Sequence, residues 1–118
     1  MPRRKREREP AETVDYTDPE GNVLTLRQSL SARTIRKIGE PPRRDAASME
    51  DVWARRNELL FERLAVRWEI AGLPLDDQKM LLGRYRMADS AEQEWVRRTI
   101  TAHVEEYIPE LARTDDRI

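Results

Sequence analysis

The sequence predicts a mainly α fold, a small helical bundle of about four helices with a short N-terminal β-hairpin. Three observations lead to this prediction. Apolar residues recur at helical spacing over 49–71 and again further along the chain, capping signals bracket those segments, and apolar residues alternate with polar neighbours around 14–27. At 118 residues the chain fits one domain. We expect that domain over 13–111, between a disordered basic and polar tail at 1–12 and a polar tail at 112–118.

The composition limits the size of the core and the chemistry that the chain can perform. Hydrophobic and charged residues each make up 38%, whereas globular proteins average about 45–50% and about 25%. A core this thin implies that part of the chain is disordered or that a partner completes the apolar surface. The absence of cysteine excludes disulfides, thiol catalysis and zinc ligation by sulfur.

No membrane or secretion signal is evident in the sequence. No apolar run approaches the roughly 20 residues that span a bilayer, and no hydrophobic segment follows the basic start of the chain. We therefore expect a cytoplasmic protein without membrane contacts.

Charge is unevenly distributed along the chain. Residues 1–44 hold eleven basic and seven acidic side chains, a net charge of +4, whereas 45–118 hold eleven basic and sixteen acidic, a net charge of −5. Opposite charges of this kind attract within one molecule, between copies, or toward other partners. The asymmetry does not select among these three.

Turn and cap residues divide the first third of the chain. The alternation over 14–27 surrounds a proline- and glycine-containing turn, which predicts the hairpin. A helix over about 31–38 follows, with Ser29 or Ser31 as its N-cap and Gly39 in the left-handed position after its end. Because a hairpin alone is unstable, we expect it to pack on the helices.

The longest predicted helix spans 49–71, from a capping box at Ser48 to Gly72. Projected at about 100° per residue, it carries a broad apolar face that includes Trp53 and Trp68, and a second, narrower apolar stripe. Either a second layer of the same fold covers this stripe, or another chain docks there. The partner-binding residues predicted on this basis are Val52, Leu59, Arg63, Val66 and Ile70.

Two further helices are predicted over about 75–87 and 91–107, and the second carries the only histidine, His103. Its face is apolar, and only Glu106 or Tyr107 of its own helix lie within reach. Catalysis or metal binding needs a second ligand, an orienting group or a nucleophile. We therefore expect a packed, hydrogen-bonded histidine, no catalytic, metal or cofactor site, and no enzymatic activity.

Nucleic-acid binding is the alternative that the sequence leaves open. The last two predicted helices have the spacing of a helix-turn-helix, but the second is rich in glutamate, which phosphate repels. The alternative therefore depends on the basic N-terminal half. Its candidate residues are Arg3, Arg4, Lys5, Arg6, Arg33, Arg36 and Lys37.

The leading hypothesis is a non-enzymatic protein–protein interaction, assembly or accessory factor that acts through a helical apolar surface. Small size, high charge and a thin core suit an accessory part of a larger complex, such as a phage particle. The expected partner is another protein or a second copy of the chain, and no small-molecule substrate or cofactor is implied.

Overall fold

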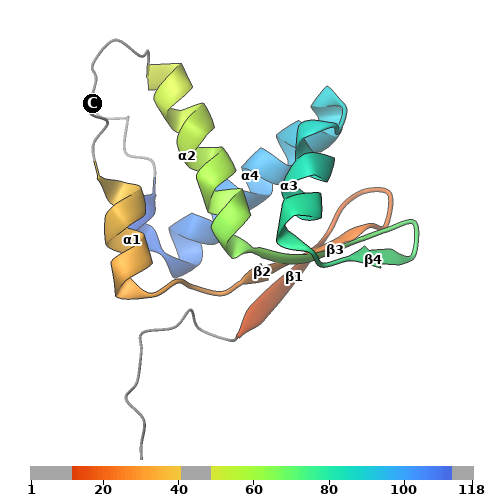
Figure 1. Cartoon of the computed structure of the whole chain (residues 1–118), viewed down its shortest axis with the longest axis horizontal. Coiled ribbons are helices and arrows are strands. Elements are labelled where there is room, and N and C mark those ends of the chain that lie inside the picture. Colours follow the sequence, from red (N-terminus) through yellow and green to blue (C-terminus); the bar gives the residue numbers. More distant parts are fainter. Residues whose placement is uncertain (1–11, 41–48, 113–118) are drawn as a thin grey trace, which may run out of the picture.

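The computed structural model describes residues 12–40 and 49–112, which form a two-layer α+β fold (Figure 1). Four antiparallel strands lie in the order β1-β2-β3-β4, and the helices cover one face of this sheet. The predicted mainly α bundle with a short hairpin is therefore wrong, because the hairpin is half of a larger sheet. In chain order the elements are β1 (Thr13–Thr17), β2 (Val23–Arg27), α1 (Ala32–Gly39), α2 (Met49–Leu64), β3 (Ala65–Ile70), β4 (Leu73–Leu75), α3 (Gln78–Arg86), α4 (Ser90–Tyr107) and the 3-10 turn η1 (Pro109–Leu111).

A row of apolar side chains crosses all four strands on the face that the helices cover. Tyr16 pairs with Leu24, Leu24 with Trp68, and Trp68 with Leu75. Cross-strand neighbours of this kind are the unit of sheet stabilisation. The neighbouring row, Thr17–Val23–Glu69–Pro74, lies on the opposite face, so one face of the sheet is apolar and the other mostly polar.

A β-bulge lies where α2 passes into β3. Thr25 pairs with Arg67 while Leu26 pairs with Ala65, which leaves Val66 as an extra residue. The bulge allows Ala65 and Trp68, three positions apart, both to be buried, whereas a regular strand would place them on opposite faces. Because α2 ends at Leu64 and β3 begins at Ala65, the helix passes directly into the strand without a loop.

The predicted helix over 49–71 is correct only as far as Leu64. The next six residues alternate in character and include β-branched Val66 and Ile70, a pattern that fits a half-buried strand. Ala71 and Gly72 both have positive φ, 52° and 79°, which is the geometry of a type I′ turn between β3 and β4. The glycine that predicted a helix end belongs to a β-hairpin.

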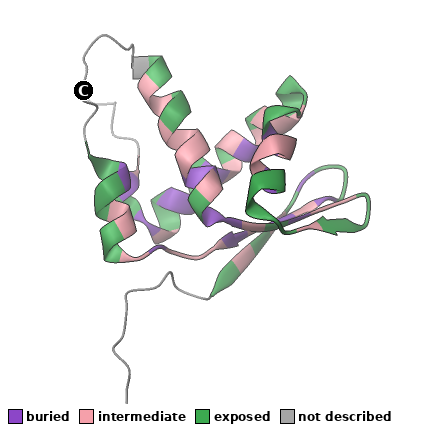
Figure 2. Ribbon diagram, viewed as in Figure 1, coloured by how far each residue is buried: buried purple, intermediate pink, exposed green. Residues whose placement is uncertain are grey.

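The core fills the space between the sheet and the helices (Figure 2). Phe61 of α2 lies at its centre, edge-on to Trp68 at 5.8 Å between ring centroids and stacked on Tyr85 of α3 at 5.0 Å. The other large apolar side chains that are fully enclosed come from β2, α2, α3, α4 and the residue after α4: Leu24, Leu26, Leu64, Leu81, Val96, Ile100 and Ile108.

Capping residues set the starts of the shorter helices. Ser31, one of the two predicted caps of α1, accepts a hydrogen bond from the Thr34 N–H. Gly39 does not have a positive φ, so the predicted left-handed end is wrong, and Glu40 follows in an extended conformation. In the described ranges no helix is both long and apolar enough to cross a bilayer.

Candidate interaction surface

The only histidine is part of a buried hydrogen-bonded group rather than an exposed site. His103 of α4 is 1% exposed. Its Nε2 lies 2.9 Å from the Arg27 carbonyl and 3.1 Å from the Gln28 carbonyl, and its Nδ1 lies 2.6 Å from the Tyr16 hydroxyl. Since carbonyls only accept, Nε2 carries the proton and Nδ1 accepts from Tyr16. The ring of Tyr107 packs beside it, 4.9 Å between centroids.

This environment keeps His103 neutral. Burial lowers its pKa, while the two carbonyls and Glu106 act in the opposite direction. Burial also raises the pKa of Tyr16, with smaller contributions from Tyr107 and Glu106. Both ring nitrogens of His103 are hydrogen-bonded to structural partners, which leaves neither nitrogen for a substrate. These hydrogen bonds connect β1, the end of β2 and α4.

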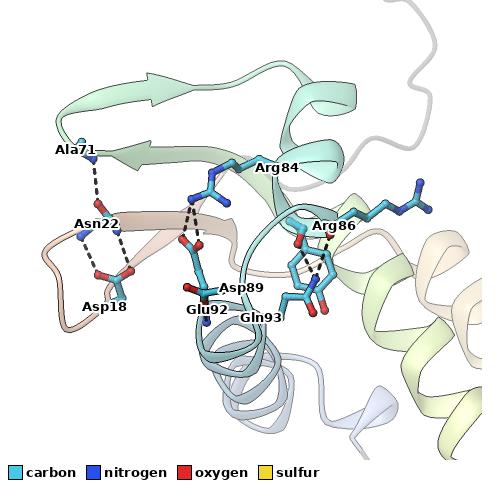
Figure 3. A network of polar contacts seen from close by, with 9 residues as sticks. Asp18, Asn22, Ala71, Arg84, Arg86, Asp89, Glu92 and Gln93 are labelled. Atoms are coloured by element: carbon cyan, nitrogen blue, oxygen red, sulfur yellow. Dashed lines mark hydrogen bonds and ion pairs between the residues drawn. The ribbon is translucent and has the colours of Figure 1, made fainter.

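A second polar group joins the two hairpin turns (Figure 3). The side chain of Asn22, after the β1–β2 turn, donates to Asp18 at 3.1 Å and accepts from the backbone N–H of Ala71 at 3.0 Å. Asp18 in turn accepts from the backbone N–H groups of Glu20 and Asn22. Asp18 and Asn22 are nevertheless buried, as satisfied polar groups often are.

The junction of α3 and α4 is held by a third polar group (Figure 3). Arg84 donates to both carboxylate oxygens of Glu92, at 3.0 and 3.2 Å, and its guanidinium lies over the Trp68 ring at 5.4 Å. Gln93 donates to the Tyr85 carbonyl at 3.0 Å. These contacts are structural, and no group of three or more potential metal ligands occurs within 12–40 and 49–112.

A groove of about 810 Å³ lies between α2 and α4. Its floor is apolar and its rim carries charges of both signs. We call this surface the α2–α4 groove, and it is lined by Glu50, Asp51, Trp53, Ala54, Asn57, Leu60, Glu94, Arg97, Arg98, Ile100, Thr101, Ala102, Val104, Glu105, Leu111 and Ala112.

Two side chains of α2 give the groove features of a binding surface. Trp53 is only partly buried, with the Arg56 guanidinium 4.8 Å above its ring, and burial lowers the pKa of Arg56. The Asn57 side-chain oxygen is buried, yet it has no hydrogen-bond partner among the described residues. Partly exposed aromatic side chains of this kind are common anchors of protein interfaces, whereas the enclosed Asn57 oxygen is not accessible to a docking chain.

The opposite wall of the groove carries an ion-paired cluster on α4. Glu94 accepts from Arg97 at 2.8 Å and lies 3.7 Å from Arg98. The hydrogen bond to Glu94 raises the pKa of Arg97. These exposed pairs contribute little to stability, but they place both signs of charge at one edge of an apolar floor.

The five partner-binding residues predicted from the sequence do not form one stripe. Val52 and Leu59 lie on α2 and Arg63 is exposed near its end, whereas Val66 and Ile70 belong to β3. Ile70 packs against the core, while Val66 lies with Thr25 and Arg67 at the polar face of the sheet. The predicted stripe depended on a helix that ends before its last two members.

The basic candidates divide between a described helix and the undescribed start of the chain. Arg33, Arg36 and Lys37 are all exposed on α1, which contains no acidic residue. The four others, Arg3, Arg4, Lys5 and Arg6, lie outside the described residues. The structure therefore places three of the seven on one helix.

The α2–α4 groove was not predicted from the sequence, because its two walls come from helices more than thirty residues apart. Trp53 was assigned to the core face of the long helix, and Asn57 was not singled out. A partly buried Trp53 beside an exposed Ala54 indicates a groove only when the position of α4 is known. No family model, curated protein or solved structure gives a significant match to this chain.

Proposed function

We propose that this protein is a non-catalytic interaction module that binds another protein chain in the α2–α4 groove. The observation that supports the proposal is the position of a partly buried tryptophan, Trp53, on the wall of a groove whose lining also includes the apolar residues Leu60 and Ile100. Rigid aromatic anchors of this kind dominate the energetics of protein interfaces. An assembly or accessory role in a larger complex, in the cytoplasm, remains the wider prediction.

The groove also has the dimensions of a helix-binding site. The residues that line it run from Glu50 to Leu60 on α2 and from Glu94 to Glu105 on α4, so each wall is roughly 16 Å long at about 1.5 Å per residue. Three turns of an amphipathic helix fit such a length, which is a common mode of protein recognition. The apolar floor supplies the affinity and the charged rim the orientation.

A pair of matched variants tests the proposal. Ala54→Arg places a long charged side chain on an exposed position of the groove, and Ala91→Arg makes the same change on an exposed position of α4 that does not line it. Each tagged full-length protein is used to capture partners from a lysate of the source cells. Untagged copies of the same chain are added to the lysate as one possible partner. The amount of partner protein retained should be similar for the wild type and Ala91→Arg. It should be at least tenfold lower for Ala54→Arg, since obstructing the groove at an interface costs about 1.4 kcal/mol or more. Equal retention by all three proteins would contradict the proposal.

The basic face of α1 supports a second candidate function, binding to nucleic-acid phosphates. Arg33, Arg36 and Lys37 lie within five consecutive positions of one helix, and all three are exposed. If they contact phosphates, binding to duplex DNA weakens steeply with salt, and replacing all three by glutamine lowers the slope by about 3. Arg63, Arg67 and Lys79 are exposed elsewhere, and their triple glutamine variant is the matched control. A slope that is unchanged in the α1 variant, or equally reduced in both variants, would reject this function.

A further inference from the structure

One edge of the sheet has an open backbone. Because the strand order is β1-β2-β3-β4, β1 has a neighbouring strand on one side only among the described residues (Figure 1). Directly after β1, the Asp18 N–H donates to the Asn22 carbonyl at 2.9 Å, so this position faces β2. Backbone groups alternate in direction along an antiparallel strand. The N–H and C=O groups of Thr13, Asp15 and Thr17 therefore point away from β2.

The opposite edge of the sheet is protected, whereas β1 is not. β4 is three residues long, and its middle residue is Pro74, which has no N–H. β1 is five residues long, contains neither proline nor a basic side chain, and pairs with β2 without a bulge. Proteins ordinarily shield open edges with these devices. Their absence from β1 favours an edge that receives a further strand.

The two faces beside this edge differ in chemistry. Tyr16 and, by alternation, Val14 point toward the helix layer, and both are only partly buried, so the apolar layer is incompletely covered at β1. Asp15 points to the opposite face and is exposed. Its carboxylate accepts a hydrogen bond from the Thr25 hydroxyl of β2 at 2.7 Å. A strand added to β1 would therefore have one apolar side and one polar side.

The polar face beside β1 is recessed and acidic. The recess, of about 580 Å³, includes the carboxylates of Asp15, Glu69 and Asp76 and one basic residue, Arg67, which is paired with Glu69 at 3.1 Å. Within 12–40 and 49–112, Asp15 and Asp76 have no ion pair. The nearest basic residue of β2, Arg27, already has an interaction of its own. Carboxylates without a cation favour a basic partner.

We propose that β1 receives, in antiparallel pairing, an extended segment of a partner protein in which apolar residues alternate with lysine or arginine. Its backbone pairs with the outward groups of β1, as in other cases of strand addition. Its apolar residues lie beside Val14 and Tyr16. Its basic residues lie opposite Asp15, where opposite charges on neighbouring strands attract, and point into the recess.

The charge of the edge argues against a second copy of β1 as the added strand. The twofold antiparallel pairing that overlaps all of β1 places Asp15 opposite itself, and like charges at that position destabilise a sheet. The surface also shares no residue with the α2–α4 groove. It is therefore a second interaction site, independent of the proposed function.

Nuclear magnetic resonance of the full chain with a model peptide tests the proposal. The peptide is capped, about seven residues long, and alternates lysine with valine, close to the usual strand length of about 5–6 residues. At saturation the N–H groups of Thr13, Asp15 and Thr17 should exchange with solvent about tenfold more slowly. Those of Val14 and Tyr16 should change little, because they already face β2.

Two control peptides separate the backbone contribution from that of charge. A glutamate–valine peptide keeps the alternation and reverses the charge. A lysine–valine peptide that is N-methylated at its lysines keeps the charge but loses the N–H groups that would pair with β1. Both should bind about tenfold more weakly than the lysine–valine peptide.

Matched variants locate the site. Asp15→Lys should weaken binding of the lysine–valine peptide by about threefold or more and strengthen binding of the glutamate–valine peptide. Asp76→Lys, at another exposed position of the recess, should act in the same direction. Glu110→Lys makes the same change at an exposed position of η1, which packs on α1 and α4, and should leave binding unchanged. Circular dichroism shows that each variant is folded.

Several results would overturn the inference. One is exchange that does not slow at about 1 mM peptide, the weak limit of such contacts. Others are equal binding of the lysine–valine peptide and its N-methylated form, or equal weakening by the Asp15→Lys and Glu110→Lys variants. Slow exchange of the outward N–H groups without peptide would show that the chain itself or a second copy covers β1. None of these results bears on the α2–α4 groove, in which no residue is changed.

Discussion

The Tyr16 hydroxyl donates a 2.6 Å hydrogen bond to Nδ1 of His103, although the two residues are 87 positions apart. Their rings meet edge-on at 5.6 Å between centroids. Tyr16 lies on β1, an edge strand of the sheet, and His103 lies on α4. The bond therefore ties the first strand to the last long helix, across the layer boundary of the fold.

Removal of the Tyr16 hydroxyl should destabilise the domain. Tyr16→Phe keeps the ring but leaves Nδ1 of a buried histidine without its donor, which costs about 1–3 kcal/mol. Urea denaturation followed by far-UV circular dichroism measures the change. Tyr107→Phe is the matched control, because its ring also packs on His103 but its hydroxyl is not the donor to Nδ1. Equal effects of the two substitutions would show that ring packing, not the hydrogen bond, is what matters.

The buried histidine also makes stability depend on pH. Burial lowers the pKa of His103 in the folded chain below the value near 6.5 of an unfolded histidine. Its contribution to the free energy of unfolding is therefore complete above about pH 6.5 and is lost as the pH falls toward the folded pKa. The groups that face it are Tyr16 from β1 and Glu106 and Tyr107 from α4.

The dependence can be assigned because the chain has one histidine. The free energy of unfolding of the wild type, measured between about pH 5 and 7 where histidine titrates, should decrease toward acid pH. His103→Gln should be less stable at pH 7 but nearly independent of pH over this window. A variant that retains the wild-type slope would assign the pH dependence to other groups.

Local sequence signals predicted the hairpin turn and the cap of α1, since these depend on neighbouring residues. The segment after Leu64 was misread because Trp68 fits an apolar helical face as well as a strand, and because Gly72 suits either a helix end or a type I′ turn. Which conformation forms is decided by pairing with β2, about forty residues earlier in the chain. A tertiary contact therefore overrides a local pattern.

The candidate site was less predictable than the fold. His103 was expected to be packed and hydrogen-bonded, but its partners were sought within its own helix, whereas Tyr16, Arg27 and Gln28 supply the hydrogen bonds. The groove requires the crossing of α2 and α4, which no spacing in either segment specifies. Periodicity identifies which face of a helix is apolar, but not which part of that face its neighbours leave open.

The β3–β4 turn offers a stabilising substitution. Ala71 has a φ of 52°, a left-handed conformation that an alanine adopts at a cost of about 1 kcal/mol and asparagine tolerates better. Asn-Gly is the preferred pair for a type I′ turn. Ala71→Asn should therefore raise the free energy of unfolding by about 0.5 kcal/mol, since the residue is exposed and its N–H bond to Asn22 is kept.

A substitution at the next position, Gly72→Ala, is the control for this turn. Gly72 has a φ of 79°, and nothing lies within 4 Å of an added Cβ. Gly72→Ala should therefore destabilise by about 1 kcal/mol through backbone strain alone. Thermal denaturation of both variants measures the two effects. If Ala71→Asn destabilises the domain, the turn does not require the left-handed conformation in solution.

Two arginines of α3 should respond differently to the same substitution. Arg84 and Glu92 have side chains that are 31% and 16% exposed, and Arg84 also lies over Trp68. Arg86 makes an ion pair with Glu58 through two hydrogen bonds, but these side chains are 59% and 36% exposed.

Lysine keeps the charge and loses the planar donor group in both cases. Arg84→Lys should therefore lower the free energy of unfolding by about 0.5–1.5 kcal/mol, whereas Arg86→Lys should give no measurable change, because solvent screens the exposed pair. Urea denaturation of the two variants compares them at equal charge. A larger loss for Arg86→Lys would mean that donation from two guanidinium nitrogens, as in the Arg86–Glu58 pair, rather than burial, sets the contribution of these pairs.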